Sequence, residues 1–346
     1  MHDLAHASVG SDAGRPVFIS WAPYCSRSDN IARELGGVSY MVYYRVFGSS
    51  YWTILFKYFC QAVKTLFLLF RDRPHCVICM SPPVVALIPV WLYCTILPGR
   101  GYIIDYHTAA FSMRIYRRMY FMQKFFARRA IVNLLTNSHL AAIVTEWGGR
   151  VLLVGDVRVR FARIERCRHL RAGFNLVFVS RYSATEPLDV VYDAARRLET
   201  EGIHILVTGA LEDAPPEAIA ERPANVTLTG FLCNEEYAGL LRDADAVMCL
   251  CTNDNTMQRG AYEAMAVETP LVLSDWPLLR DTFSSGAVYV DNSAASICNG
   301  IRTLRGNLQS YKLGVRELKA RRSAAWDATL GQLKVHIERF LSDAQR

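Results

Sequence analysis

The residue types with the most specific chemical potential lie in a polar loop between a short apolar strand and a helix. The loop follows a predicted strand at residues 246–250 and opens a predicted helix at residues 257–267. The first backbone amides of such a helix point into the loop, and together with the helix dipole they favour binding of a diphosphate. We therefore expect a phosphate site here. Its members are Asn255, Thr256, Met257, Gln258 and Arg259.

Glu263 lies farther along the same predicted helix. From there its carboxylate can accept hydrogen bonds from a ribose diol, as an acidic residue does in other Rossmann-type nucleotide sites. A single glutamate on a helix is also common at protein surfaces, so an ordinary surface position is the alternative interpretation.

Asp105 and His107 are the candidate catalytic residues. They close a predicted strand at residues 102–106, and ligands of doubly wound sheets bind at the edge where such strands end. Either side chain can act as a base that accepts a proton from a substrate hydroxyl, and His107 can instead hold a sugar hydroxyl. The alternative interpretation is that both residues only cap a helix.

Ser26, Arg27 and Ser28 lie in the first turn of the chain, between a predicted strand at residues 17–21 and a predicted helix at residues 28–35. A turn that leads into a helix can receive a phosphate group of a substrate. Ser28 can equally serve as a plain helix N-cap. The turn lacks the G-x-G-x-x-G pattern, so a dinucleotide fingerprint is missing.

Residues 113–129 form a predicted basic helical segment in which arginines alternate with aromatic residues. Arg117, Arg118, Arg128 and Arg129 are expected to face an anionic membrane, because basic residues beside aromatic ones suit a lipid interface. The same composition suits stacking on RNA bases, and an ordinary surface helix packed on its own domain is a third interpretation.

Alternating strands and helices hold these residues, and the alternation predicts two α/β domains with doubly wound parallel sheets. We expect a flexible tail at residues 1–15, a Rossmann-like domain at 16–165, a second at 174–309, and C-terminal helices at 310–346 that cross back to the first domain. The linker is placed at residues 158–173. The remaining predicted strands are at 38–43, 75–80, 130–136, 151–154, 175–180, 204–208, 226–229, 271–274 and 287–290.

Two predicted helices of the first domain are apolar enough to raise the question of a membrane span. In the predicted helix at residues 52–71, Lys57, Gln61 and Lys64 recur at spacings that place them on one face. This pattern indicates an amphipathic helix. The predicted helix at residues 84–97 is too short to span a bilayer, so we expect it to be a buried core helix.

Composition limits the class of protein. The chain has 346 residues, is 51% apolar and carries a net charge of +7, so it is long enough for two globular domains. Residues 1–170 hold 21 Lys/Arg and 9 Asp/Glu, which makes the first half the basic one. Residues 1–15 lack the apolar run of a secretory signal. We expect a cytoplasmic protein, peripheral on the inner face of the cell membrane.

Residues 262–272 resemble the E-A-M-A-x-G-x-P-V-V signature of family 4 and related GT-B glycosyltransferases, the group 1 glycosyl transferases. The resemblance implies that Glu263 binds the nucleotide ribose of the donor. Residues 178–182 resemble the start of the family's C-terminal domain and imply that Arg181 meets the donor diphosphate. The chain departs from the family at two places: Asn255 stands where the family has a glutamate, and Glu186 lies near the place of the family's lysine.

The resemblance implies a GT-B fold, in which two Rossmann-like domains face a cleft, and a hexosyltransferase that uses a nucleotide-diphosphate sugar as donor. Residues 81–83 and 104–107 resemble mannosyltransferases that extend lipid-linked chitobiose and invert configuration. The implied acceptor is a lipid-linked glycan or polysaccharide precursor. We expect no cofactor, no metal, because a suitable Asp-x-Asp loop is missing, and no nucleic-acid partner. A GT-B-type sugar-nucleotide epimerase and an inactive nucleotide-sugar-binding partner protein remain alternatives.

Overall fold

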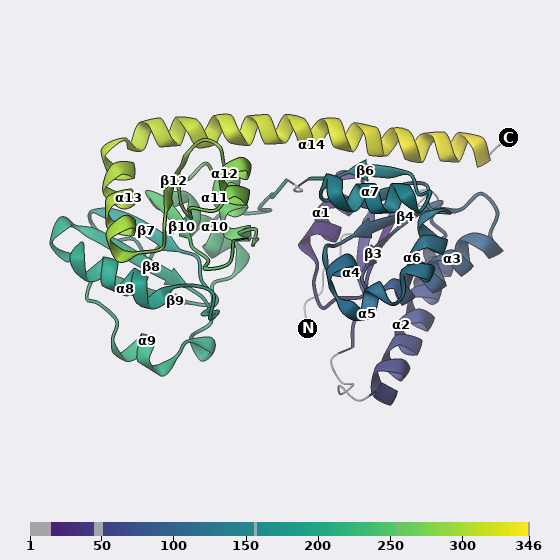
Figure 1. Cartoon of the computed structure of the whole chain (residues 1–346), viewed down its shortest axis with the longest axis horizontal. Coiled ribbons are helices and arrows are strands. Elements are labelled where there is room, and N and C mark those ends of the chain that lie inside the picture. The colour runs from purple at the N-terminus through teal and green to yellow at the C-terminus, as the bar shows by residue number, and fades with distance from the viewer. Residues whose placement is uncertain (1–14, 45–50, 156–157, 255, 345–346) are drawn as a thin grey trace. The chain divides into compact units, whose positions relative to one another are not determined.

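The computed structural model describes residues 15–44, 51–155, 158–254 and 256–344, and these form two compact units (Figure 1). The first unit contains the described residues up to 155 together with residues 325–344, and the second contains those from 158 to 324. The predicted flexible tail lies, apart from Arg15, outside the described residues.

The first unit is built on six parallel strands in the order β2-β1-β3-β4-β5-β6. Strands β3 and β4 are buried along their whole length, because helices cover both faces of a parallel sheet. The strand order reverses between β1 and β3, so a ligand site is expected beyond their carboxyl ends. The strands are β1 (Val17–Ser20), β2 (Val38–Met41), β3 (Cys76–Ser81), β4 (Gly101–Tyr106), β5 (Asn133–Leu135) and β6 (Val151–Leu153).

Helices of the first unit lie at most of the predicted places. The predicted helix at residues 84–97 begins with a short 3-10 turn, η1 (Val84–Ala86), before the α-helix starts. The helices are α1 (Ser26–Glu34), α2 (Tyr51–Asp72), α3 (Leu87–Ile96), α4 (Ala109–Ser112), α5 (Arg114–Arg117), α6 (Tyr120–Ala127) and α7 (Ser138–Glu146).

The second unit repeats the doubly wound design with the order β12-β11-β10-β7-β8-β9, all parallel. The order reverses between β7 and β10. Its strands are β7 (Phe174–Phe178), β8 (Ile203–Thr208), β9 (Val226–Gly230), β10 (Ala246–Cys249), β11 (Leu271–Ser274) and β12 (Ala287–Val290). Its helices are α8 (Leu188–Arg197), η2 (Glu199–Glu201), η3 (Leu211–Asp213), α9 (Pro216–Ala220), α10 (Asn234–Asp243), α11 (Arg259–Ala266), α12 (Pro277–Thr282) and α13 (Ala294–Gly306).

The segment predicted as a linker, residues 158–173, belongs to the second unit. The backbone N–H of Glu165 donates to the carbonyl oxygen of Glu235, at 3.1 Å. Gly239 permits this packing, because a Cβ atom there would lie 1.9 Å from the carbonyl oxygen of Glu165. An arginine-rich segment without periodicity is therefore held against α10.

A single helix, α14 (Leu308–Ala344), contributes to both hydrophobic cores. Val315 and Leu318, in its first part, belong to a core cluster of the second unit. Its last part packs on the first unit's sheet through a row of buried side chains. They are Trp326, Leu330, Leu333 and Ile337.

The basic segment at residues 113–129 is not one continuous helix. Met113 has an extended backbone (φ −76°, ψ 127°) and Met119 is also non-helical (φ −100°, ψ 18°), so the segment divides into α5 and α6, after α4 has ended at Ser112. These breaks let Gln123 turn inward, where its amide donates to the carbonyl oxygens of Ala110 and Tyr116.

Helix α2 does not keep the three predicted polar residues on one face. Gln61 is buried and donates to the carbonyl oxygen of Val42, whereas Lys64 is exposed. Thr65 is buried on the same side as Gln61, and Phe59 and Phe67 are exposed. Helix α3 is not a buried core helix throughout, because Ile96 and two other apolar side chains of it are exposed. Sequence periodicity therefore did not show which face of either helix meets the core.

We predict that Leu333→Ala lowers the free energy of unfolding by about 2–5 kcal/mol, because it leaves a cavity between α14 and the sheet of the first unit. Denaturant unfolding, with hydrogen exchange of the β3 and β4 amides, measures the change. Val335→Ala, at an exposed position of the same helix, is the matched control and should change stability by less than about 0.5 kcal/mol. Equal effects of the two variants would contradict the packing of α14 on this sheet.

Candidate functional site

The second unit holds a cavity of about 660 Å³ beyond the carboxyl ends of β7 and β10, where its strand order reverses. The loop after β7 and the start of α11 supply much of its lining. Of the predicted donor residues, the structure brings six together around the cavity, and Asn255 lies outside the described residues. The six are Arg181, Thr256, Met257, Gln258, Arg259 and Glu263.

Glu263 is a buried residue of the cavity wall, with 9% of its surface exposed. Arg259 Nε donates to its Oε1 at 2.6 Å, and the hydroxyl of Tyr237 donates to its Oε2 at 2.9 Å. Burial, together with the Glu263 charge, raises the pKa of Tyr237 well above its ordinary value, so the hydroxyl stays protonated and donates. Each carboxylate oxygen keeps a further lone pair for a ligand hydroxyl.

The start of α11 lies at the cavity. Gln258 is the N-cap residue, and its own side chain makes no capping hydrogen bond. Gly260 lets the helix approach the strand ends closely, because a Cβ atom there would lie 2.8 Å from Val179 Cγ1. The first amides of a helix and the helix dipole make such a helix start suitable for an anion.

Glu186 occupies a second set of amides at the cavity, in the loop after β7. Its Oε2 accepts from the backbone N–H of Arg181 at 2.8 Å, from the N–H of Ser183 at 3.2 Å and from Ser180 Oγ at 2.7 Å. A carboxylate thus binds the amides that could otherwise hold a phosphate. The sequence showed Glu186 only as a departure from a family pattern and did not reveal this role.

Phe231 also lines the cavity, and 83% of its surface is exposed. A flat aromatic ring at the rim can stack on a nucleobase. Two basic and three acidic side chains line the cavity, so its side chains alone do not make an electropositive site. They are Arg181, Arg259, Asp213, Glu186 and Glu263. Phe231 was not among the predicted site residues.

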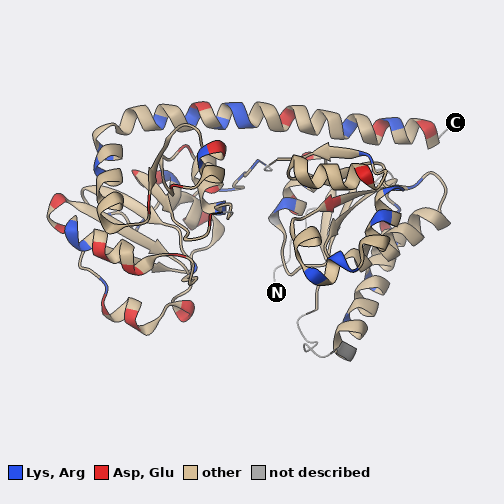
Figure 2. Ribbon diagram, in the orientation of Figure 1, with Lys and Arg blue, Asp and Glu red and all other residues tan. Residues whose placement is uncertain are grey.

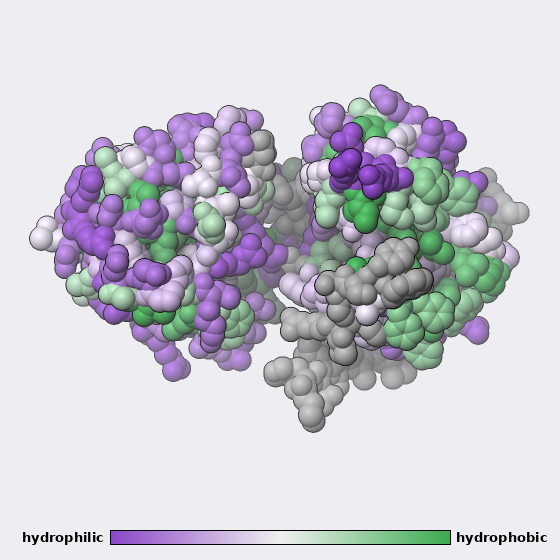
Figure 3. Space-filling view, turned by 60° about the horizontal axis from the view of Figure 1, so that its bottom comes forward, coloured by the Kyte–Doolittle hydropathy of each residue, from purple (hydrophilic) through white to green (hydrophobic). Residues whose placement is uncertain are grey.

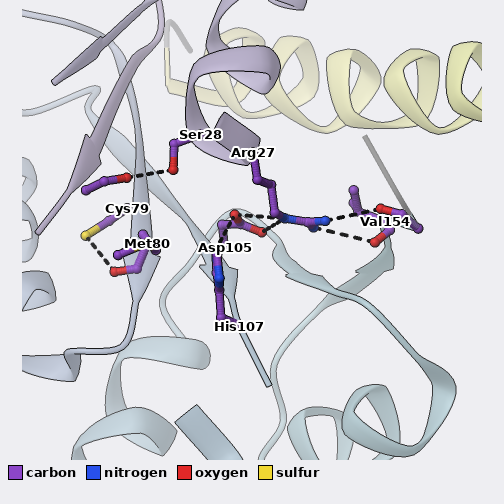
Figure 4. Close-up of polar contacts among 9 residues, drawn as sticks. Arg27, Ser28, Cys79, Met80, Asp105, His107 and Val154 are labelled. Atoms are coloured by element: carbon purple, nitrogen blue, oxygen red, sulfur yellow. Dashed lines mark hydrogen bonds and ion pairs between the residues drawn. The ribbon is translucent and has the colours of Figure 1, made fainter. Parts of the chain in front are cut away.

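In the first unit, the structure brings together Arg27, Asp105 and His107 (Figure 4). Asp105 lies on β4, and its side chain is completely buried. Arg27 Nε donates to both of its carboxylate oxygens at 3.1 Å, and the guanidinium also donates to the carbonyl oxygens of Val154 and Gly155. His107 Nε2 lies 3.5 Å from Asp105 Oδ2.

Charges in this group stabilise one another. Burial opposes the ionised form of Asp105, but Arg27 and His107 hold the pKa of its carboxyl below the usual value. Burial also opposes the protonated form of His107, yet the side chains of Asp105 and Cys25 raise its pKa to about 9. Burial alone would raise the pKa of the Cys25 thiol, but hydrogen bonds with His107 and Ser28 lower it below its usual value. His107 exposes 33% of its side chain and is therefore the member that a ligand can reach.

The other two residues of the first turn are placed differently. Cys25, and not Ser28, is the N-cap residue of α1, because the helix begins at Ser26. Ser28 is buried, and its Oγ lies 2.6 Å from Ser20 Oγ on β1 (Figure 4). The side chain of Ser26 is outside the described part of the chain.

The four arginines that were predicted to face a membrane are all exposed on the first unit. Arg128 Nε donates to the carbonyl oxygen of Trp147. Arg129 lies over the ring of Phe125, 3.8 Å from its centroid. Arg117 and Arg118 lie at the end of α5.

We predict that His107 titrates near pH 9 in an NMR titration and that Asp105→Asn shifts this pKa toward 6.5. A raised pKa in the folded state gives a contribution to stability that is present below pH 6.5 and is lost as the pH rises through about 9. His336, whose pKa is lowered chiefly by burial, should titrate identically in both proteins. An unshifted His107 in Asp105→Asn would show that the two groups are not coupled.

Comparisons with known proteins place both units in context. Residues 173–307 match the family model described as glycosyl transferases group 1, and no curated protein matches the chain. Sucrose-phosphate synthase from Thermosynechococcus elongatus superposes with a TM-score of 0.65 and 12% identity, covering 95% of this chain and 100% of that one. A glycosyltransferase from Rickettsia africae superposes with a TM-score of 0.64 and 11% identity, covering 95% of this chain and 99% of that one. The calicheamicin glycosyltransferase CalG4 superposes with a TM-score of 0.57 and 11% identity, covering 94% of this chain and 99% of that one.

At these identities the structural matches show the fold alone. They cover nearly the whole chain, and with the two six-stranded parallel sheets they confirm the predicted GT-B class of two Rossmann-like domains. The family match covers the unit that contains the cavity, including Arg181 and Glu263. Residues 173–307 are therefore a group 1 glycosyl transferase domain, and the chain is a glycosyltransferase of the GT-B fold.

Proposed function

We propose that the protein transfers a sugar from a nucleotide-diphosphate sugar to a hydroxyl of a lipid-linked glycan or polysaccharide precursor. One observation carries the donor part: Glu263 and the start of α11 line one cavity of the second unit. The basic first half of the chain supports an acceptor that bears phosphate, and we place the protein in the cytoplasm at the inner face of the cell membrane.

The donor groups find matching partners around the cavity. The ribose diol donates to the carboxylate of Glu263, and the diphosphate lies against the first amides of α11 with Arg181 and Arg259 nearby. Phe231 stacks on the nucleobase. The donor needs no metal in this proposal, because amides and arginines offset the diphosphate charge. Among the described residues no three His, Cys, Asp or Glu side chains gather as metal ligands.

His107 activates the acceptor hydroxyl in this proposal, and Asp105 is a positioning residue. The imidazole removes the hydroxyl proton as the oxygen attacks the anomeric carbon and the nucleoside diphosphate leaves, which inverts configuration. The buried Asp105 cannot reach an acceptor directly, and it holds the imidazole while Arg27 keeps it ionised. Because only unprotonated His107 can act as a base, turnover should rise with pH toward about 9.

The position of Glu186 supports a second candidate function: a protein that binds nucleotide sugars without turning them over. Its carboxylate occupies the amides after β7 and adds a negative charge to the cavity. A transfer assay with analysis of the donor product separates the candidates. Release of nucleoside diphosphate with a glycosylated acceptor supports transfer, an altered free donor indicates epimerisation, and an unchanged bound donor supports the inactive protein.

We predict that Glu263→Ala weakens donor binding by about 10- to 150-fold, because hydrogen bonds to a charged acceptor contribute about 1.5–3 kcal/mol. Isothermal titration with nucleotide sugars measures it. Tyr237→Phe keeps the carboxylate and should bind with nearly normal affinity, which separates loss of Glu263 from loss of its neighbour. Glu217→Ala, at an exposed position outside the cavity, is the control. Unchanged affinity in Glu263→Ala would remove Glu263 from the donor site.

We predict that Glu186→Gln tightens binding of a nucleoside diphosphate by about 10-fold, the change produced by one charge at about 10 Å with an effective dielectric constant near 20. The gain should shrink as salt is added. The affinity for the uncharged nucleoside should stay unchanged, and so should both affinities in Glu199→Gln, an exposed control. A weaker diphosphate complex in Glu186→Gln would show that Glu186 is needed to shape the loop.

A further inference from the structure

The inward face of helix α2 buries two polar side chains beside Leu68 and Leu69, whereas the four phenylalanines of the helix are exposed. Gln61 and Thr65 lie on the inward face and are almost completely buried. Thr65 Oγ1 accepts from Trp21 Nε1 at 3.0 Å, and the amide of Gln61 donates to the carbonyl oxygen of Val42. These buried hydrogen bonds fix which face of the helix looks outward.

The outward face of α2 carries an apolar stripe, which we call the α2 stripe. Phe59 and Phe67 expose 65% and 57% of their surfaces. The members recur at spacings of three and four, so they form one continuous row along the helix. They are Phe56, Phe59, Val63, Phe67 and Phe70. A row of exposed aromatic side chains of this length is unfavourable in water and marks a contact surface.

Neighbouring elements of the first unit extend the apolar surface. Phe70 of α2 packs edge-on against Tyr93 of α3, and Trp91 of α3 packs edge-on against Phe125 of α6. Hydrophobic residues gather on the first unit in Figure 3, whereas the visible face of the second unit is mostly hydrophilic. Helices α3, α5 and α6, together with Met113 before α5, expose further apolar side chains. They are Ile88, Leu92, Ile96, Met113, Ile115, Phe121 and Phe125.

Positive charge accompanies this surface. Residues 35–145 contain 12 Lys/Arg and only two acidic residues, Asp72 and Asp105. Asp105 is buried against Arg27 and Asp72 is paired with Arg71, so each carboxylate cancels one positive charge. The segment still keeps a large excess of basic residues, which are blue in Figure 2. Lys64 Nζ lies 5.2 Å from the ring centroid of Phe67, which places an ammonium group beside the α2 stripe.

The combination of exposed apolar and basic side chains favours a lipid bilayer as the partner of this surface. Aliphatic and aromatic side chains beside basic ones match acyl chains next to anionic headgroups. Among the described helices, α2 passes the length and composition test for a bilayer span over residues 53–72. However, its inward hydrogen bonds through Gln61 and Thr65 tie it to the β1 side of the sheet, which favours a helix that lies in the membrane interface.

We propose that the first unit docks on a bilayer containing anionic lipid by inserting the α2 stripe into the interface. Lys57 and Lys64 of α2 and the exposed Arg117 and Arg118 of α5 then lie at the headgroup phosphates. The proposal concerns membrane binding alone and does not depend on the transfer reaction.

Vesicle flotation of the full-length protein tests this docking, with phosphatidylcholine vesicles that contain or lack phosphatidylglycerol. Phe59→Ser/Phe67→Ser should lower the partition coefficient by about 100-fold or more, because each buried aromatic side chain contributes at least about tenfold. Ile219→Ser/Leu313→Ser, at exposed apolar positions of the second unit, is the matched control and should bind like the unmodified protein. Thermal unfolding without vesicles verifies that each variant is folded.

A second variant tests the charges. Replacing Lys57, Lys64, Arg117 and Arg118 together by glutamine should lower binding to the anionic vesicles by about fivefold for each charge lost and should remove most of its salt dependence. Equal binding of the unmodified protein to neutral and anionic vesicles would overturn the headgroup contact. Normal binding of Phe59→Ser/Phe67→Ser, or self-association that depends on the α2 stripe in a protein that binds no vesicles, would overturn the docking proposal.

Discussion

A carboxylate that is withdrawn from water needs its charge matched by donors, and each unit satisfies this constraint at the edge of its sheet. In the first unit Arg27 and His107 surround Asp105, and in the second Arg259 and Tyr237 bind Glu263. One partner in each group comes from a distant segment of the chain: Arg27 in the first unit and Tyr237 in the second. Each group is therefore complete only when the unit that contains it has folded correctly.

Glu186 shows the same constraint applied to the donor cavity. Its carboxylate accepts hydrogen bonds from two amides of the loop after β7, which stabilises the loop. The consequence is a negative charge beside the place proposed for a diphosphate. Arg181 and the start of α11 are then left to offset the charge of the ligand. The Glu186 carboxylate thus stabilises the loop but weakens the electrostatic attraction between the cavity and the proposed donor diphosphate.

The sequence predicted the strands well because each is a short apolar run between turn residues, and β11 and β12 have the expected boundaries. It also indicated that Asp105 and His107 end a strand. It could not predict that Arg27 would bind Asp105, because this contact joins residues 78 positions apart. The start of α1 was placed two residues too late, since Ser28 resembles an N-cap but lies buried against Ser20. Local patterns specify elements, whereas side-chain partners depend on the register of the sheet.

Helix α2 shows that a hydrophobic pattern alone does not tell which face of a helix meets the core. Its amphipathic period was evident, and the usual rule assigns the apolar face to the core. Here Trp21 and the carbonyl of Val42 need hydrogen-bond partners beneath the helix, and Thr65 and Gln61 supply them. Turning the helix to bury Phe59 and Phe67 would leave these polar groups unpaired in a dry interior, at a cost of about 1–3 kcal/mol for each. The exposed face of α2 therefore follows from what the core requires.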